Sequence, residues 1–121
     1  EVAAIVNKYD QVLDSNVYGV EVKSAEGRAG MALLSITDEF NFNEFSEHIE
    51  KNLNAFQLPY FLRITEKMKT TGTFKHQKED LKKQGFDPES TEDKIYFYQK
   101  GNYIEMSNDL YNRIQSGEER F

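Results

Sequence analysis

A short stretch near the middle of the chain, Thr70-Thr-Gly-Thr-Phe-Lys75, holds the residues whose types and spacing could do chemistry. Gly72 would leave backbone N–H groups open to a ligand, the threonines supply hydroxyl groups, and Lys75 supplies a positive charge. The residues from His76 to Gly85 predict a short helix after this loop, and the first N–H groups of a helix have no partner within it. Together these groups could hold an anion.

The loop does not match a Walker A sequence, because no Gly-Lys-Ser/Thr follows a glycine at the required spacing. A glycine-containing turn that ends in a solvated lysine is common on protein surfaces. On spacing alone, this ordinary turn explains residues 70–75 better than an anion site does. The pattern by itself leaves both interpretations open.

A wider comparison of motifs favours a functional role. Gly72-Thr-Phe-Lys75-His-Gln-Lys78, followed by Leu81 and Gly85-Phe-Asp-Pro88, resembles the C-terminal signature of fatty-acid transport proteins and very-long-chain acyl-CoA synthetases. Those proteins belong to the adenylate-forming superfamily, together with peptide-synthetase adenylation domains and luciferases. Other segments resemble the same family in the same order, so the resemblance covers nearly the whole chain: residues 16–22, 26–32, 58–63, 95–98 and 110–114.

The resemblance implies that Lys75 is the catalytic lysine. It would contact the fatty-acid carboxylate and the ATP α-phosphate, in a site held mainly by a larger N-terminal domain. A carboxylate that attacks a phosphate brings two anions together, and a cation between them lowers the repulsion. Thr71, Gly72 and Thr73 are then expected near the ATP or AMP. Lys78 could meet a CoA phosphate, although a solvated position on the helix explains this residue better.

One position departs from the wider superfamily. Many members have a glycine immediately before the lysine, whereas Phe74 stands there and Gly72 lies three residues before Lys75. The transport-protein branch shares this arrangement, so the departure favours that branch. It leaves open which backbone groups near Lys75 touch the nucleotide.

The implied parent protein is a long- or very-long-chain fatty acyl-CoA synthetase. It would convert fatty acid, ATP and CoA into acyl-CoA, AMP and pyrophosphate through an acyl-adenylate, with Mg²⁺. The chain opens on Glu1-Val2 without an initiator Met, so we expect residues 1–121 to be its single C-terminal domain, with the large N-terminal domain and the hinge outside. Alone, this domain is expected to be inactive and to hold no cofactor.

Two other functions stay open at this stage. The chain could be an interaction or uptake domain in which Lys75 has no catalytic role. It could also belong to an adenylating enzyme that acts on a different carboxylate. The sequence does not give the acyl chain length, because the acyl tunnel would lie in the larger domain.

Composition limits the remaining function classes. A length of 121 residues fits one domain, and a net charge of −6 argues against a nucleic-acid module, which usually carries a basic face. The absence of cysteine excludes a thiolate nucleophile and a Cys-type zinc site. No apolar run approaches the roughly 20 residues that span a bilayer. We expect the parent in the cytoplasm or peripheral to the cytoplasmic face of a membrane.

Two histidines and one arginine are further residues whose types could serve a site. His48 has no second histidine four residues away, and His76 has no Ser and Asp partners that spacing could supply, so no metal site or catalytic triad is predicted. Arg28, in the Glu-Gly-Arg-Ala-Gly segment, is interpreted as a loop-shaping residue or an interdomain ion-pair partner.

The pattern of apolar residues predicts an α+β domain: a small, mostly antiparallel sheet flanked by helices. Residues 10–16 are expected to be a polar connection and residues 23–30 a hairpin loop. Residues 31–36, nearly all apolar, are expected to form the central strand. The remaining expected elements are helix 2–9, strand 17–22, a helix capped by Asn41 or Asn43, strand 60–64, a helix ended by Gly85, hairpin 95–106 and a last helix between Ser107 and Gly117.

Overall fold

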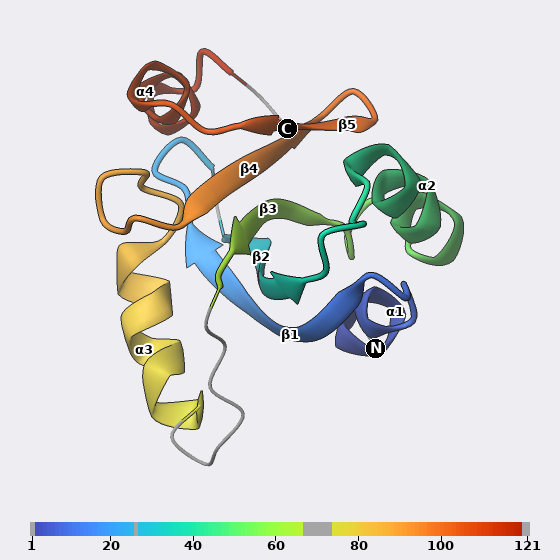
Figure 1. Cartoon of the computed structure of the whole chain (residues 1–121). Helices are drawn as coiled ribbons and strands as arrows, with labels where there is room; N and C mark the ends of the chain where they lie inside the picture. The colour runs from blue at the N-terminus through green and yellow to red at the C-terminus, as the bar shows by residue number, and fades with distance from the viewer. Residues whose placement is uncertain (1, 26, 67–73, 120–121) are drawn as a thin grey trace.

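The computed structural model describes residues 2–25, 27–66 and 74–119, with the backbone alone for residues 74–77. Within these residues four helices and five strands follow one another (Figure 1): α1 (Val2–Asn7), β1 (Val12–Glu21), β2 (Arg28–Ile36), α2 (Phe42–Asn52), β3 (Pro59–Ile64), α3 (Phe74–Gln84), β4 (Lys94–Gln99), β5 (Asn102–Glu105) and α4 (Asn108–Ser116). The strands form one sheet in the order β1-β2-β3-β4-β5. Only the β2–β3 pair in that sheet is parallel, so the predicted fold class is confirmed.

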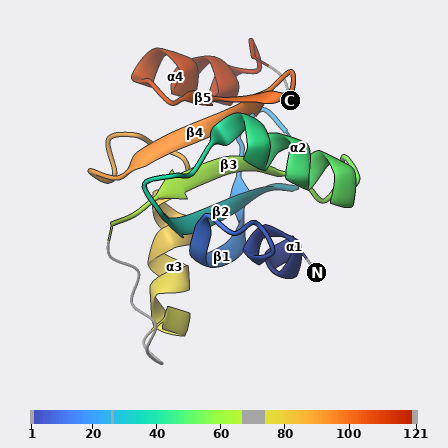
Figure 2. The same cartoon turned by 45° about the vertical axis from the view of Figure 1, so that its right-hand side comes forward.

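The helices cover both faces of this sheet (Figure 2). Helices α1 and α2 pack on one face, over a core that includes Val6, Leu34, Phe45 and Ile49. Helices α3 and α4 lie on the other face, over a second core that includes the residues Met31, Phe61, Leu81, Phe86, Phe97 and Ile114. The parallel pairing of β2 with β3 requires a crossover connection, and α2 supplies it. The sheet is therefore buried on both faces.

Local sequence signals set the ends of the helices and the hairpin. The Asn41 side chain accepts a hydrogen bond from the Glu44 N–H at 3.0 Å, and so caps α2. Ser107 caps α4 in the same way at 3.1 Å, through the Leu110 N–H. The β4–β5 turn places Lys100 at φ 51° and Gly101 at φ 84°, the left-handed pair that suits a two-residue hairpin. These predicted caps and the predicted hairpin are confirmed.

Two expected boundaries are wrong. Residues 10–16 are not a connection throughout, because β1 begins at Val12 and pairs with β2 over its whole length. Its polar residues lie mostly at the half-buried or exposed positions of an extended strand, so they do not break it. The strand at residues 31–36 begins earlier, at Arg28, and β3 is the middle strand in place of β2. As expected, however, β2 is buried on both faces.

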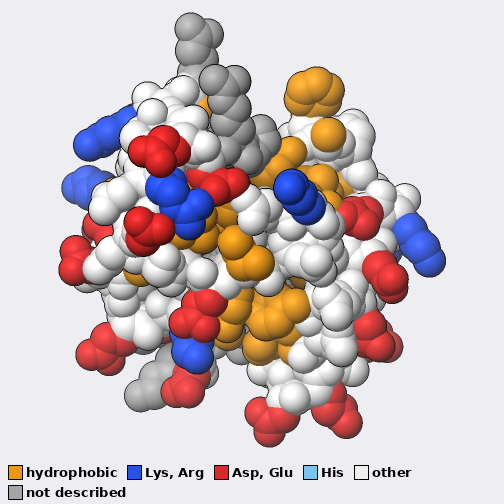
Figure 3. Space-filling view, turned by 90° about the horizontal axis from the view of Figure 1, so that it is seen from above, with side chains coloured by type: hydrophobic (Ala, Val, Ile, Leu, Met, Phe, Trp, Pro, Cys, Tyr) orange, Lys and Arg blue, Asp and Glu red, His pale blue; other side chains and the backbone are white. Residues whose placement is uncertain are grey.

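The surface agrees with the acidic composition. Figure 3 looks onto the β5 edge of the sheet and shows hydrophobic side chains gathered in the middle, with acidic side chains around them. Ile104 of β5 is one of the large hydrophobic residues that stay exposed, at 37%. The rings of Phe42 on α2 and Tyr96 on β4 pack together, with centroids 4.4 Å apart. Across the described ranges, no helix is long and apolar enough to cross a bilayer.

Tyr18 is a buried polar residue in the core beneath α3 and α4. It is 5% exposed, and its hydroxyl group has no hydrogen-bond partner among the described residues. Burial raises the pKa of Tyr18 to about 12; the Arg63 cation opposes this shift and the Asp93 carboxylate adds to it. The neutral phenol is therefore the form that the folded chain favours.

This raised pKa predicts an alkaline loss of stability. Tyr18 keeps its proton in the folded chain but loses it near pH 10 when unfolded, so its contribution is complete below pH 10 and is lost as the pH rises toward 12. The loss has a limit of about 1.4 kcal/mol per pH unit. In urea unfolding, the free energy of unfolding of the Tyr18→Phe variant should fall less between pH 10 and pH 12 than that of the native sequence. An equal fall in both proteins would contradict the role of Tyr18.

Candidate functional site

Helix α3 carries the backbone of the predicted catalytic lysine. Lys75 is the second residue of α3, so it lies in the first turn. Figures 1 and 2 show α3 running away from the sheet, with this first turn as its far end. The other predicted residues of the loop, Thr71, Gly72 and Thr73, lie outside the described residues, as does the side chain of Lys75. Their predicted roles stay predictions.

Lys78 lies one turn further along α3 and is half-buried. It makes no ion pair with any residue in the described part of the chain. The helix therefore presents two lysines, at positions 75 and 78, near its N-terminal end. Its C-terminal end also carries two, Lys82 and Lys83, which complement the helix dipole.

The C-terminal end of α3 is its anchor. Among the α3 side chains that the structure describes, residues 78–84, only Leu81 is buried. Gly85 ends the helix at φ 56°, and its N–H donates to the Leu81 carbonyl at 2.9 Å. Phe86 follows and stacks on Phe61 of β3, with ring centroids 4.3 Å apart and ring planes 16° apart. Among residues 78–86, the apolar contacts therefore come from Leu81 and from Phe86 just beyond the C-terminal end of α3.

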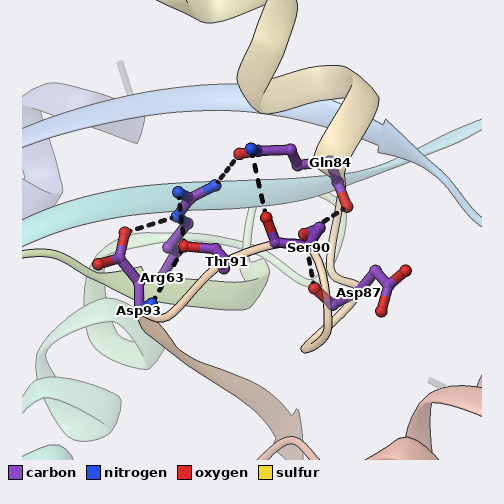
Figure 4. A network of polar contacts seen from close by, with 6 residues as sticks. All are labelled: Arg63, Gln84, Asp87, Ser90, Thr91 and Asp93. Atoms are coloured by element: carbon purple, nitrogen blue, oxygen red, sulfur yellow. Dashed lines mark hydrogen bonds and ion pairs between the residues drawn. The ribbon is translucent and has the colours of Figure 1, made fainter.

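A buried guanidinium holds the same end (Figure 4). Arg63 of β3 is 8% exposed. Its Nε donates to Asp93 Oδ2 at 2.8 Å, its Nη1 to Gln84 Oε1 at 2.5 Å and its Nη2 to Thr91 Oγ1 at 2.9 Å. Each nitrogen of the guanidinium therefore binds a different residue. Three parts of the chain meet there: the end of β3, the last residue of α3 and the segment before β4.

The segment between α3 and β4 is ordered by its own polar contacts. Ser90 Oγ donates to the Asp87 carbonyl at 2.7 Å, and the Thr91 Oγ1 accepts from the Asp93 N–H at 3.0 Å. Gln84 Nε2 donates to the Ser90 carbonyl at 3.4 Å. The Asp, Pro, Ser and Thr residues of segment 87–93 are typical of an exposed turn. The structure has a turn there, but Thr91 and Asp93 are half-buried because they bind Arg63.

Arg28 borders a cleft on the α3–α4 face, with a volume of about 520 Å³. It is exposed at the start of β2, opposite Glu21 of β1, and makes no ion pair within the described ranges. Its side chain lies across Gly19, where an added Cβ would come within 3.3 Å of it. The contact explains why a glycine suits position 19. An interdomain ion pair of Arg28 stays a prediction.

His48 has a structural contact. Its Nε2 lies 2.6 Å from the Ile5 carbonyl oxygen and links α2 to α1. The described residues contain no group of three His, Cys, Asp or Glu side chains that could hold a metal ion. The side chain of His76 lies outside the described residues.

Sequence reasoning missed the role of Arg63. The signal was a single charge in the apolar strand Pro59–Ile64, since a charge in such a place is usually paired. The pattern could not identify the partners, because Gln84, Thr91 and Asp93 come 21 to 30 residues later.

Comparison with known sequences confirms the resemblance. The chain is 42% identical over 118 residues to long-chain fatty acid transport protein 2 of Rattus norvegicus. This alignment covers 94% of the chain and 19% of that protein. It is 38% identical over 122 residues to long-chain fatty acid transport protein 6 of Mus musculus, which covers 98% of the chain and 20% of that protein. The chain thus spans about a fifth of these relatives. No family model matches it.

Solved structures share the fold. Coronafacic acid ligase from Pectobacterium brasiliense aligns with a TM-score of 0.57 and 16% identity, over 81% of this chain and 19% of the ligase. A double mutant of o-succinylbenzoate CoA synthetase from Bacillus subtilis aligns with a TM-score of 0.56 and 18% identity, over 66% of this chain and 17% of the synthetase. The fold of this chain is therefore one that also occurs within these two larger enzymes.

The Arg63 contacts predict that replacing Arg63 lowers the stability of the fold far more than replacing Arg113 does. Arg63→Ala leaves Asp93 and Gln84 without their partner in a mostly buried site and should lower the free energy of unfolding by about 3 kcal/mol. Arg113→Ala is the control, because the Arg113 side chain is 40% accessible and its ion pairs with Asp109 and Glu119 lie nearer the solvent; it should cost less than about 1 kcal/mol. Urea unfolding measures both, and equal losses would contradict the prediction.

Proposed function

We propose that this chain is the mobile C-terminal domain of a long- or very-long-chain fatty acyl-CoA synthetase. Its alignment with long-chain fatty acid transport proteins covers about a fifth of their length. The parent would convert fatty acid, ATP and CoA into acyl-CoA, AMP and pyrophosphate through an acyl-adenylate. The rest of the parent would supply the hinge, the acyl site and most ATP contacts. Its location would be the cytoplasm or the cytoplasmic face of a membrane.

The observation that carries this proposal is the homology over nearly the whole chain, at 42% identity to a fatty acid transport protein. The Thr-Gly-Thr-Phe-Lys segment supplies the lysine that the resemblance requires. The backbone of Lys75 lies at the far end of α3 from the sheet (Figure 1), which suits a residue that must enter a site on another domain. The shared fold with CoA ligases supports the same function.

The proposed chemistry of Lys75 is electrostatic. In adenylation the fatty-acid carboxylate attacks the ATP α-phosphate, and pyrophosphate leaves. An ammonium group between the two anions lowers their repulsion and stabilises the charge of the transition state. A lysine suits this place because its compact charge donates up to three hydrogen bonds.

The other groups near Lys75 would have supporting roles. Thr71, Gly72 and Thr73 would lie near the ATP or AMP, and Lys78 would meet a CoA phosphate in the thioester-forming pose. Mg²⁺ would accompany ATP in the larger domain.

The lysine is tested in the full-length parent by separating the two half-reactions. Lys75→Ala should lower the rate of acyl-adenylate formation by roughly 10²–10³, the usual cost of losing one electrostatic stabiliser. Thioester formation from supplied acyl-adenylate should change far less, because the carboxylate has already been activated. Pyrophosphate exchange measures the first step and acyl-CoA release the second.

Lys51→Ala is the matched control, since Lys51 is an exposed lysine in the last turn of α2, on the other face of the sheet. It should leave both steps unchanged. Intact adenylation by Lys75→Ala would instead favour an interaction or uptake domain, and comparable losses in both steps would count against the proposed role. Activity of the parent on aryl or bile acids, without activity on fatty acids, would point to a different carboxylate.

A second prediction concerns the isolated chain. Residues 1–121 would provide the lysine but neither the acyl site nor the main ATP site, so they should produce no acyl-CoA from fatty acid, ATP and CoA. Adding the remaining domain as a separate polypeptide is the positive control. Production of acyl-CoA by residues 1–121 alone would refute the proposal that the acyl site and the main ATP site lie in the rest of the parent.

A further inference from the structure

The end of β3 and the end of α3 are joined directly by a side-chain contact, and Lys75 lies in the sequence between them. Arg63 is the second-last residue of β3, and Gln84 is the last residue of α3. Their side chains are joined by the 2.5 Å hydrogen bond from Arg63 Nη1 to Gln84 Oε1, across 21 positions of sequence. Lys75 lies between them. The bond therefore links the two ends of segment 63–84, which contains the lysine.

The direction of this bond is fixed by the other contacts of Arg63. The guanidinium is planar and presents its N–H groups in a rigid fork. Nε is held by Asp93 at 2.8 Å and Nη2 by Thr91 at 2.9 Å, and the side chain of Arg63 is 10% accessible. With two nitrogens held, Nη1 can point in one direction only, and Gln84 lies there (Figure 4).

Helix α3 lies beside β1, but few of its described side chains, residues 78–84, are buried in a way that could set its direction. Leu81 is its one buried side chain among residues 78–84, and Phe86 packs just beyond its end. From Gln84 back to Lys75 the helix spans about 14 Å, at about 1.5 Å per residue. A tilt of about 5° at the base would therefore move Lys75 by about 1 Å. A displacement of about 1 Å in a catalytic group can cost about a hundredfold in rate.

We propose that Arg63 is a positioning residue: through its bond to Gln84 it sets the direction of α3, and thereby the place of Lys75 during adenylation. This inference rests on the proposed function. Arg63 touches no substrate in this scheme and acts through the helix. Thioester formation does not use Lys75, so it should not depend on the bond.

The test removes the side-chain amide of Gln84, and with it the bond from Arg63 and the longer 3.4 Å bond to the Ser90 carbonyl. In the full-length parent, Gln84→Met keeps the length of the side chain but removes the acceptor of Arg63 Nη1. We expect adenylation to fall by about tenfold, a smaller loss than that of a fully misplaced group, with thioester formation from supplied acyl-adenylate unchanged. Gln115→Met is the matched control, because Gln115 is a half-buried glutamine on α4 that also accepts a hydrogen bond, from the Lys23 N–H at 2.8 Å. It should leave both steps unchanged.

A double variant separates positioning from general destabilisation. If Gln84 acts through Lys75, Gln84→Met should lower adenylation no further once Lys75→Ala is present. A loss of the same factor in both backgrounds would mean a merely structural role and would overturn the inference. Normal adenylation by Gln84→Met, or an equal loss in Gln115→Met, would overturn it as well.

The failure of this inference can be told apart from the failure of the proposed function. If Lys75→Ala alone left adenylation intact, the proposed function would fail and this inference with it. Defective adenylation by Lys75→Ala beside normal adenylation by Gln84→Met would reject this inference alone.

Discussion

The α3 side of the domain depends on the pairing of one buried charge. A guanidinium taken out of water loses hydration that only well-placed acceptors can replace. Arg63 finds these acceptors on Asp93, Gln84 and Thr91, which come from the end of α3 and from the segment that leads into β4. The end of α3 and the start of β4 are thus held to β3 by polar contacts, beside the stack of Phe61 and Phe86.

The two faces of the sheet are stabilised in different ways. On the α1–α2 face, aromatic rings make a dense cluster: Tyr9 and Phe40 lie 5.5 Å apart, and Phe45 and Tyr103 6.0 Å apart. The α3 helix on the other face has little apolar surface of its own, and most of its residues are charged or polar. A helix of this composition gains little from hydrophobic burial, so the specific contacts at its described C-terminal end contribute much to holding it in place.

Patterns that are local in sequence were sufficient for most of the fold. Asn41, Ser107 and Gly101 act within a few residues of themselves, so caps and turn could be predicted without knowledge of the tertiary structure. The start of β1 could not, because the residues from Val12 to Asn16 become a strand only through their pairing with β2. The contacts of Arg63 were equally hidden, since they join residues far apart in the chain. The site motif was visible in sequence, while its support was not.

The arrangement of helices on two faces has a practical consequence. Helix α2 lies on the face opposite α3 (Figure 2), so a dye attached to an exposed position such as Lys51 would stay clear of the lysine-bearing end. Because the chain has no cysteine, one introduced at that position would be the sole thiol of these 121 residues. In the full-length parent, fluorescence from such a label could follow the proposed movement of this chain relative to the rest of the protein.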